Sequence, residues 1–87
     1  MEFEWDAAKA ASNLAKHGVD FPTATKVFDD PDIRLRADPR PRGEMRFQAI
    51  GSVNDVTLFI SYTMRGEVCR IISARRASRR ERQSHSL

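Results

Sequence analysis

The sequence predicts an α+β domain in which two helices come first, short strands follow and one helix closes the chain. Apolar residues recur with a helical period as far as Phe28, and from Ile33 the period changes from about 3.6 residues to about two. The chain has 87 residues, which suits one domain over 1–87 and not two. We therefore expect two N-terminal helices packed on a small antiparallel sheet of three to four strands, with a closing C-terminal helix.

Capping residues mark both expected N-terminal helices. Asp6 is suited to begin a first helix over residues 7–17, and Gly18 is suited to end it. Asp20 is a second N-cap, and Pro31 ends the following helix because it disfavours helix in the residue before it. The apolar face of the first helix is expected to consist of Ala7, Ala10, Ala11 and Leu14, with Lys9, Asn13 and Lys16 on another face.

Alternating side chains predict the strands. The alternating or apolar stretches are "IRLRA" (33–37), "MRFQAIG" (45–51), "VTLFISYT" (56–63) and "VCRIIS" (68–73). The third stretch is the most continuously apolar, which favours a central place in the sheet. Proline and glycine over residues 38–44 predict a loop between the first two strands.

The segment from Ala74 onward is expected to be helical and to fray over Ser84–Leu87. Helical spacing then places its arginines on two adjacent faces: Arg75, Arg79 and Arg82 on one, Arg76 and Arg80 on the next. Like charges at these spacings repel one another, so a helix of this kind is expected to take its counterions from an external anion.

Charge is distributed unevenly along the chain. The formal net charge is +3, from 15 lysines and arginines against 12 aspartates and glutamates. Met1–Pro31 is roughly balanced, whereas Arg65–Arg82 is strongly basic. Arginine dominates the basic part, and its planar fork binds phosphate and carboxylate bidentately. We expect a polyanionic partner, either RNA, DNA or an acidic protein; the alternative is a solvated charged face.

Strand alternation adds to this basic surface. Arg34 and Arg36, like Arg46 and Gln48, fall on the side of their strands opposite the apolar residues. If the two strands are neighbours, these side chains form a positive sheet surface. Arg70 interrupts an apolar strand, so it is expected either to be half-buried against a partner or to reach the rim of a site.

Several classes of site are excluded or disfavoured. Cys69 is the only cysteine, so no internal disulfide or cysteine-based zinc site forms, and a buried thiol is expected there. No histidine or carboxylate cluster has metal-ligand spacing, and no glycine-rich phosphate loop occurs, so no metal and no cofactor are expected. No apolar run is long enough for a membrane span, and the N-terminus has no hydrophobic signal region. A cytoplasmic protein without membrane contact is expected.

Two residues are candidates for proton transfer. His17 lies in the last turn of the first helix, where it is either a general acid, a phosphate contact or a simple helix cap, because histidine is the side chain that most often moves protons near neutral pH. Glu44 opens a strand near Arg46 and is either a general base or a surface carboxylate paired with that arginine. Arginines with a few acid–base groups and no metal suit RNA cleavage, in which the 2′-hydroxyl supplies the nucleophile.

Three separated segments resemble the BrnT family of small toxins from type II toxin–antitoxin systems. They are "FEWDAAKAASNLAKHGVDF" (3–21), "GEMRFQAIG" (43–51) and "RIISARRASRRER" (70–82). The resemblance implies a RelE-like fold and a ribonuclease that arrests translation. It also implies neutralisation by a BrnA-like antitoxin, which carries the DNA-binding domain, so that contact with DNA is indirect.

The resemblance also extends to individual residues. The family pattern "WDxxK…KHG" matches Trp5, Asp6, Lys9, Lys16, His17 and Gly18; "ExRF" matches Glu44, Arg46 and Phe47; "RxISAR…ER" matches Arg70, Ser73, Arg75, Glu81 and Arg82. Trp5 and Phe47 are expected in the core. Many relatives carry a tyrosine one turn after the last pattern, where this chain has His85.

The leading hypothesis is a metal-independent endoribonuclease toxin. Its catalytic residues are expected to be His17, Glu44, Arg46, Arg70 and Arg75, and its phosphate-binding residues Lys9, Lys16, Arg76, Arg79 and Arg80. Two alternatives stay open: a non-catalytic nucleic-acid-binding subunit, and an interaction protein whose basic surface docks an acidic partner.

Overall fold

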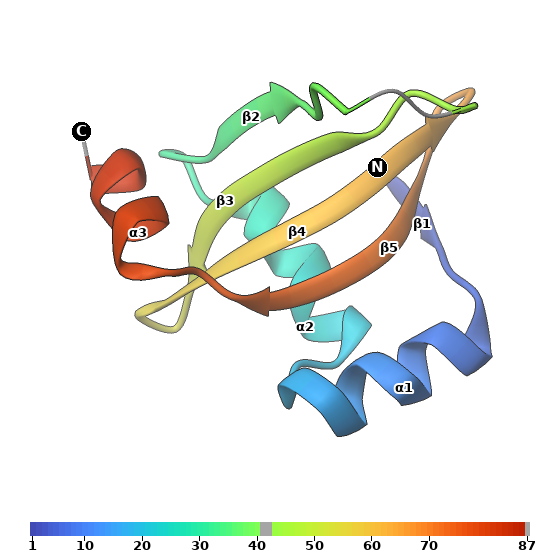
Figure 1. The fold of residues 1–87 in the computed structure, drawn as a ribbon, viewed down its shortest axis with the longest axis horizontal. Coiled ribbons are helices and arrows are strands. Elements are labelled where there is room, and N and C mark those ends of the chain that lie inside the picture. Colours follow the sequence, from blue (N-terminus) through green and yellow to red (C-terminus); the bar gives the residue numbers. More distant parts are fainter. Residues whose placement is uncertain (41–42, 87) are drawn as a thin grey trace.

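The computed structural model describes residues 1–40 and 43–86, except for the side chains of residues 85 and 86. The elements are β1 (Glu2–Glu4), α1 (Ala7–His17), α2 (Phe21–Thr25), a 3₁₀ turn η1 (Lys26–Asp29), β2 (Arg34–Ala37), β3 (Phe47–Val53), β4 (Val56–Arg65), β5 (Val68–Arg76) and α3 (Arg79–Ser86) (Figure 1). The loop expected over 38–44 lies between β2 and β3, and its residues 41 and 42 are outside the described part.

The strands form one five-stranded sheet in the order β1-β5-β4-β3-β2. β1 runs parallel to β5, and every other neighbouring pair is antiparallel. The predicted α+β class, with two helices first and a closing helix, is confirmed, but the predicted antiparallel sheet of three to four strands is wrong. β1 is only three residues long. Such a segment is too short to show an alternating pattern, and only its long-range pairing with β5 makes it a strand.

The caps of α1 form as expected. The Asp6 carboxylate accepts hydrogen bonds from the backbone N–H groups of Ala8 at 2.8 Å and Lys9 at 3.1 Å. Gly18 ends the helix with φ 71°, a left-handed conformation that glycine adopts without strain. The expected apolar face is largely exposed, however: Leu14 is 49% exposed.

The residue of α1 that is buried is polar. The Asn13 side-chain amide donates to the carbonyl oxygens of Val19 at 3.0 Å and Ala74 at 2.8 Å. Its side-chain oxygen accepts from the Ala74 N–H at 3.1 Å. Asn13 thus pairs with β5 as a neighbouring strand would, and it satisfies backbone groups at that edge of the sheet. This contact fixes α1 beside β5.

The main core lies between the sheet and α2. Its fully buried members include Phe21, Val27, Ile60 and Ile71, and Trp5 and Phe47 pack against it as predicted. Gly51 of β3 allows η1 to approach the sheet, because a Cβ atom there would lie 2.8 Å from Val27 Cγ1. Cys69 is also fully buried, as expected, and burial raises the pKa of its thiol to about 11.

The C-terminal segment differs most from expectation. β5 continues to Arg76, which pairs with Leu58 of β4, and the helix begins only at Arg79. The prediction that Arg75 and Arg76 belong to the closing helix is therefore wrong; they are strand residues on opposite faces of the sheet. Pairing with β4 outweighs the helical propensity of "ARRAS". The predicted fraying over 84–87 lies partly outside the described residues, and the backbone is helical as far as Ser86.

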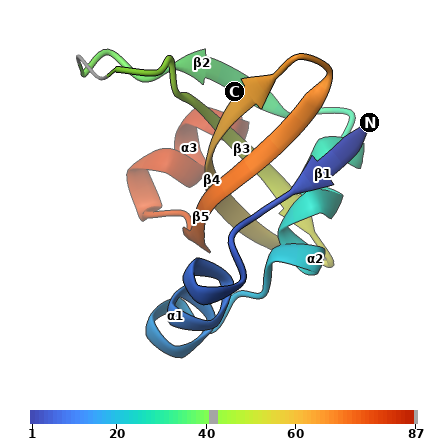
Figure 2. The same cartoon turned by 90° about the vertical axis from the view of Figure 1, so that its right-hand side faces the viewer.

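The sheet separates α2 from α3, which lie on its opposite sides (Figure 2). A small second cluster of Ile50, Phe59 and Ala77 lies on the α3 side. We call the sheet face opposite α2 the open face. No helix of the described residues is both long and apolar enough to cross a membrane.

Candidate nucleic-acid interface

Strand register arranges the open-face side chains in cross-strand rows. One row contains Arg75, Phe59, Ile50 and Arg34; the next contains Ser73, Ser61, Gln48 and Arg36; a third contains Glu4, Arg70 and Thr63. Arg75 and Arg34 end the first row, and Arg70 lies between Glu4 and Thr63 in the third. The second row, which we call the middle row, has Arg36 at one end and otherwise consists of hydroxyl and amide side chains. Neighbouring strands are about 4.8 Å apart, so the middle row spans roughly 14 Å from Ser73 to Arg36.

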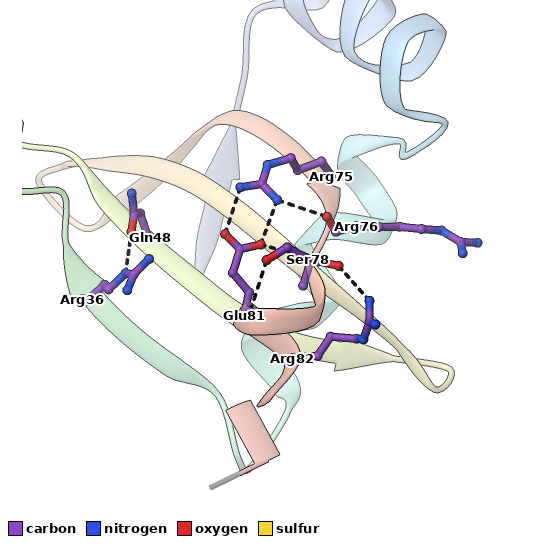
Figure 3. Close-up of polar contacts among 8 residues, drawn as sticks. Arg36, Gln48, Arg75, Arg76, Ser78, Glu81 and Arg82 are labelled. Carbon is purple, nitrogen blue, oxygen red and sulfur yellow. Dashed lines mark hydrogen bonds and ion pairs between the residues drawn. The ribbon is translucent and has the colours of Figure 1, made fainter. Parts of the chain in front are cut away.

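The positive surface predicted for β2 and β3 is confirmed. Arg36 lies opposite Gln48, and its Nε donates to the Gln48 side-chain oxygen at 2.6 Å (Figure 3). Arg46 falls on the same side, one residue before β3, where its carbonyl accepts the Asp38 N–H at 2.8 Å. No carboxylate in the described part of the chain forms an ion pair with Arg34, Arg36 or Arg46, so these charges are available to an external anion.

Arg70 and its neighbour Glu4 form an ion pair across β5 and β1. The Arg70 side chain is 26% exposed, so it is half-buried, and the pair lies at the rim of the open face. Arg70 is therefore half-buried against Glu4 of the same chain, and part of its side chain still reaches the surface.

Arg75 is held in place from three directions. Its Nη1 and Nη2 donate to the two carboxylate oxygens of Glu81 at 2.8 and 3.0 Å, and Nη1 also donates to the Arg76 carbonyl oxygen at 3.2 Å (Figure 3). Its Cζ lies 4.2 Å from the centroid of the Phe59 ring, a cation–π contact. The guanidinium thus has a fixed orientation above β4.

Glu81 also caps α3. Its Oε1 accepts the Ser78 N–H at 2.7 Å, while the Ser78 Oγ accepts the Glu81 N–H at 3.2 Å. This reciprocal pair is a capping box, and its sequence signature "SRRE" was a local signal for a helix that begins after Ser78. Hydrogen bonding to Arg75 lowers the pKa of the Glu81 carboxyl below its usual range.

The three capping carboxylates make the fold sensitive to acid. The pKa values of Asp6 and Asp20 are lowered chiefly by backbone hydrogen bonds from Lys9 and Thr23, and that of Glu81 by Arg75. Their stabilisation is therefore complete above the ordinary values of 3.8 and 4.5, and it is lost as pH falls through the lower folded-state values. We expect the melting temperature, followed by circular dichroism, to fall between about pH 5 and about pH 2. A constant melting temperature over this interval contradicts the assignment.

A shallow hollow of about 220 Å³ lies between α1 and β5. Its lining residues include Lys9, Lys16 and His17 from α1 and Ile72 and Ser73 from β5. Ser73 also belongs to the middle row of the open face, opposite Ser61. The basic residues of α1 therefore border the open face across the edge of β5, where the register shift in the pairing of β4 with β5 occurs.

Glu44 lies elsewhere. Its carboxylate is 3.4 Å from the Arg65 Nε, and both side chains are about half exposed. Arg65 is at one end of β4, whereas Arg75 contacts Phe59 near the other end. The six-residue separation along β4, from 59 to 65, corresponds to roughly 20 Å. The structure therefore does not bring Glu44 together with Arg75, and the ion pair considered between Glu44 and Arg46 is replaced by one with Arg65.

Arg76 points away from the Arg75–Glu81 pair (Figure 3). It lines a different hollow, of about 210 Å³, together with Val19 and Val53. Arg79 and Arg80 are exposed in the first turn of α3. The five terminal arginines thus do not form one surface, and the His85 side chain is outside the described residues.

Comparison with known protein families identifies the chain. A family model described as "Ribonuclease toxin, BrnT, of type II toxin-antitoxin system" matches residues 5–81. The chain belongs to the BrnT family. Membership makes it a ribonuclease toxin of a type II toxin–antitoxin system, which implies an RNA substrate and an antitoxin partner. No curated protein matches the chain.

The BrnT assignment confirms the family that the sequence motifs indicated. Three residues that organise the open face and its edge were not singled out for those roles: Glu81 and Phe59, which hold Arg75, and Asn13, which holds α1 against β5. In the described residues, no group of three or more histidine, cysteine, aspartate or glutamate side chains is arranged to hold a metal ion.

Proposed function

We propose that this BrnT-family chain is a metal-independent endoribonuclease that cleaves RNA on the open face and thereby arrests translation. The observation that carries the proposal is that Arg34 and Arg75 lie in the row on one side of the middle row and Arg70 in the row on its other side, while the middle row itself contains Arg36 and three uncharged hydrogen-bonding side chains. A phosphodiester over that row has guanidinium groups on both sides. Positive groups fixed in this way stabilise the negative charge that develops on phosphorus-bound oxygens in the transition state.

Arg75 is the proposed contact to the scissile phosphate, because it is the arginine whose orientation is most completely fixed. Arg70, which lies opposite Thr63, and Arg46, which precedes β3, are proposed to bind the phosphate from the other side of the middle row. Arg34 and Arg36 are proposed to hold the flanking RNA. Ionic contacts of this kind release counterions, so binding is expected to weaken steeply with salt.

The proposed reaction uses the 2′-hydroxyl of the substrate. Its oxygen attacks the adjacent phosphorus, its proton leaves to a base, and the bond to the 5′-oxygen breaks as that oxygen takes up a proton. His17 is proposed for one of the two proton transfers, because it shares a hollow with Ser73 of the middle row. Glu44 is left out, because its ion pair with Arg65 lies roughly 20 Å from Arg75 along β4.

The antitoxin partner is proposed to be BrnA-like and to carry the DNA-binding domain, so that this chain contacts DNA only through it. Lys9 and Lys16, which share the α1 hollow with His17, and Arg79 and Arg80 on α3 are exposed cations to which no proton transfer is assigned. They are proposed to bind flanking phosphates or an acidic segment of the antitoxin.

The test is cleavage of a long labelled RNA by the purified chain with EDTA present. We expect fragments ending in 2′,3′-cyclic phosphate, and no cleavage where the attacking 2′-hydroxyl is replaced by hydrogen. The Arg75→Ala variant, purified in the same way, controls for contaminating nuclease. Salt-dependent RNA binding without cleavage at any protein concentration supports the non-catalytic alternative, and no RNA affinity at moderate salt supports a protein-docking surface.

A further inference from the structure

Arg75 presents an apparent conflict, since the arginine proposed to bind the phosphate is already paired with a carboxylate. The geometry of the pair resolves it. A guanidinium has five N–H donors: two on Nη1, two on Nη2 and one on Nε. Glu81 occupies one donor of each Nη, and the Arg76 carbonyl occupies the second donor of Nη1.

The remaining two donors lie on one edge of the group. The Nε–H and the second Nη2–H point in the same direction, and we call them the side edge of the guanidinium, whereas the Nη1–H and Nη2–H that bind Glu81 form its end edge. No described residue accepts a hydrogen bond from either side-edge donor. Two parallel N–H groups are the arrangement that binds two oxygens of one phosphate. The Arg75 side chain is 38% exposed, so an anion can reach it.

We propose that Glu81 is a positioning residue for RNA cleavage, which holds the end edge of Arg75 so that its side edge receives the scissile phosphate. This inference rests on the proposed function. Glu81 suits the task because its own position is fixed: its side chain is only 17% exposed, and the Ser78 N–H binds the same Oε1 that Arg75 binds. The backbone N–H of Ser78, which alanine at this position would keep, thereby helps Glu81 to fix an arginine of β5.

The two carboxylate oxygens are essential to this geometry. In Glu81→Gln, an amide nitrogen replaces one oxygen and faces an Arg75 N–H donor, so one hydrogen bond is lost and two donors oppose each other. The guanidinium then loses its fixed orientation, while its charge and its contact with Phe59 remain. Ground-state attraction to RNA is carried by the other arginines as well, so the loss is expected mainly in the chemical step.

The experiment compares kcat and KM of Glu81→Gln and Ser78→Ala with those of the unchanged chain on one short labelled RNA. For Glu81→Gln we expect kcat to fall about 10-fold to 100-fold, with KM changed less than about 3-fold. Ser78→Ala removes the hydroxyl cap but leaves the Arg75–Glu81 pair, so it is expected to lower the melting temperature and to leave kcat within about 2-fold. If Glu81 has only a structural role, both variants lower the melting temperature and leave kcat nearly unchanged, and that result overturns the proposal.

A double-mutant cycle separates positioning from direct catalysis. In an Arg75→Lys background there is no fork to hold, so Glu81→Gln is expected to cost less than about 3-fold in kcat. If Glu81→Gln lowers kcat in the Arg75→Lys background as much as it does in the unchanged chain, Glu81 acts independently of Arg75, for example as a base, and the inference is overturned. If the unchanged chain cleaves RNA and Arg75→Lys impairs it while Glu81→Gln does not, only the positioning role fails. If the unchanged chain does not cleave RNA, the proposed function fails and the inference with it.

Discussion

Replacing Arg75 with alanine is expected to lower kcat for RNA cleavage about 100-fold to 1,000-fold and to relieve growth arrest when the chain is expressed without an antitoxin. The substitution removes the most rigidly held positive group of the open face, the one that rests on Phe59 and is fixed by Glu81. A fixed donor acts on the charge of the transition state without a reorganisation cost, which is why the loss is expected in kcat.

The matched control is the adjacent residue. Arg76→Ala removes the same charge from the same strand, but Arg76 lies on the opposite side of β5 and borders the hollow formed with Val19 and Val53. We expect cleavage by Arg76→Ala to remain within about 3-fold of the unchanged chain, a loss typical of a distant surface charge. Equal losses in the two variants would mean that cleavage responds to total charge and not to a placed guanidinium.

Folding must be measured for both variants. Arg75→Ala leaves the largely buried Glu81 carboxylate without its fork, at a cost of about 1 to 3 kcal/mol. The Ser78 N–H still binds Glu81, so the helix cap persists. A melting temperature above the assay temperature therefore distinguishes a catalytic loss from unfolding.

Local signals in the sequence were sufficient to place the N-terminal helices. Asp6, Gly18 and Asp20 act within a few residues of themselves, so their capping roles follow from short-range chemistry. Alternation likewise placed Arg36 and Gln48 on one surface, because a strand reverses its side chains at every residue. The capping box of Ser78 and Glu81 was an equally local signal, and applying it predicts where the last helix begins.

Long-range pairing explains what the sequence did not reveal. The Glu4–Arg70 pair joins residues that are 66 positions apart, and it exists only because β1 aligns in parallel with β5. The helix propensities of Arg75 and Arg76 predict that they belong to the closing helix, but pairing with Phe59 and Leu58 makes them strand residues. Whether Arg75 and Arg76 are helix or strand residues decides on which face of the sheet each charge lies. The position of Arg75 in the candidate site therefore could not be predicted from local sequence patterns.

Asn13→Asp, which exchanges the side-chain amide nitrogen for an oxygen, is expected to destabilise the fold strongly. The side-chain amide of Asn13 donates to the Val19 and Ala74 carbonyl oxygens. A carboxylate donates no hydrogen bond, so both buried carbonyls lose their partner and face a negative charge instead. The cost is about 2 to 5 kcal/mol, against a total stability of roughly 5 to 10 kcal/mol for a small domain.

The pH dependence of Asn13→Asp gives a second, independent reading. Because the introduced carboxyl group would be buried beside carbonyl oxygens, its folded-state pKa is expected to rise above the ordinary value of an aspartate. Protonation restores one donor, so the deficit in melting temperature relative to the unchanged chain should shrink as pH falls through that raised value. A deficit that is constant from neutral to acidic pH would show that the carboxylate does not face the carbonyls.

Asn54→Asp is the matched control, because it makes the same chemical change at an exposed turn residue. Asn54 has φ 50°, and aspartate tolerates this left-handed conformation nearly as well as asparagine. We expect its melting temperature to change little. Asn13 also holds Lys9, Lys16 and His17 beside Ser73, so any Asn13→Asp protein that remains folded is expected to cleave RNA more slowly. If the folded fraction of Asn13→Asp cleaves RNA as fast as the unchanged chain, the basic residues of α1 take no part in the reaction and the open face alone carries it out.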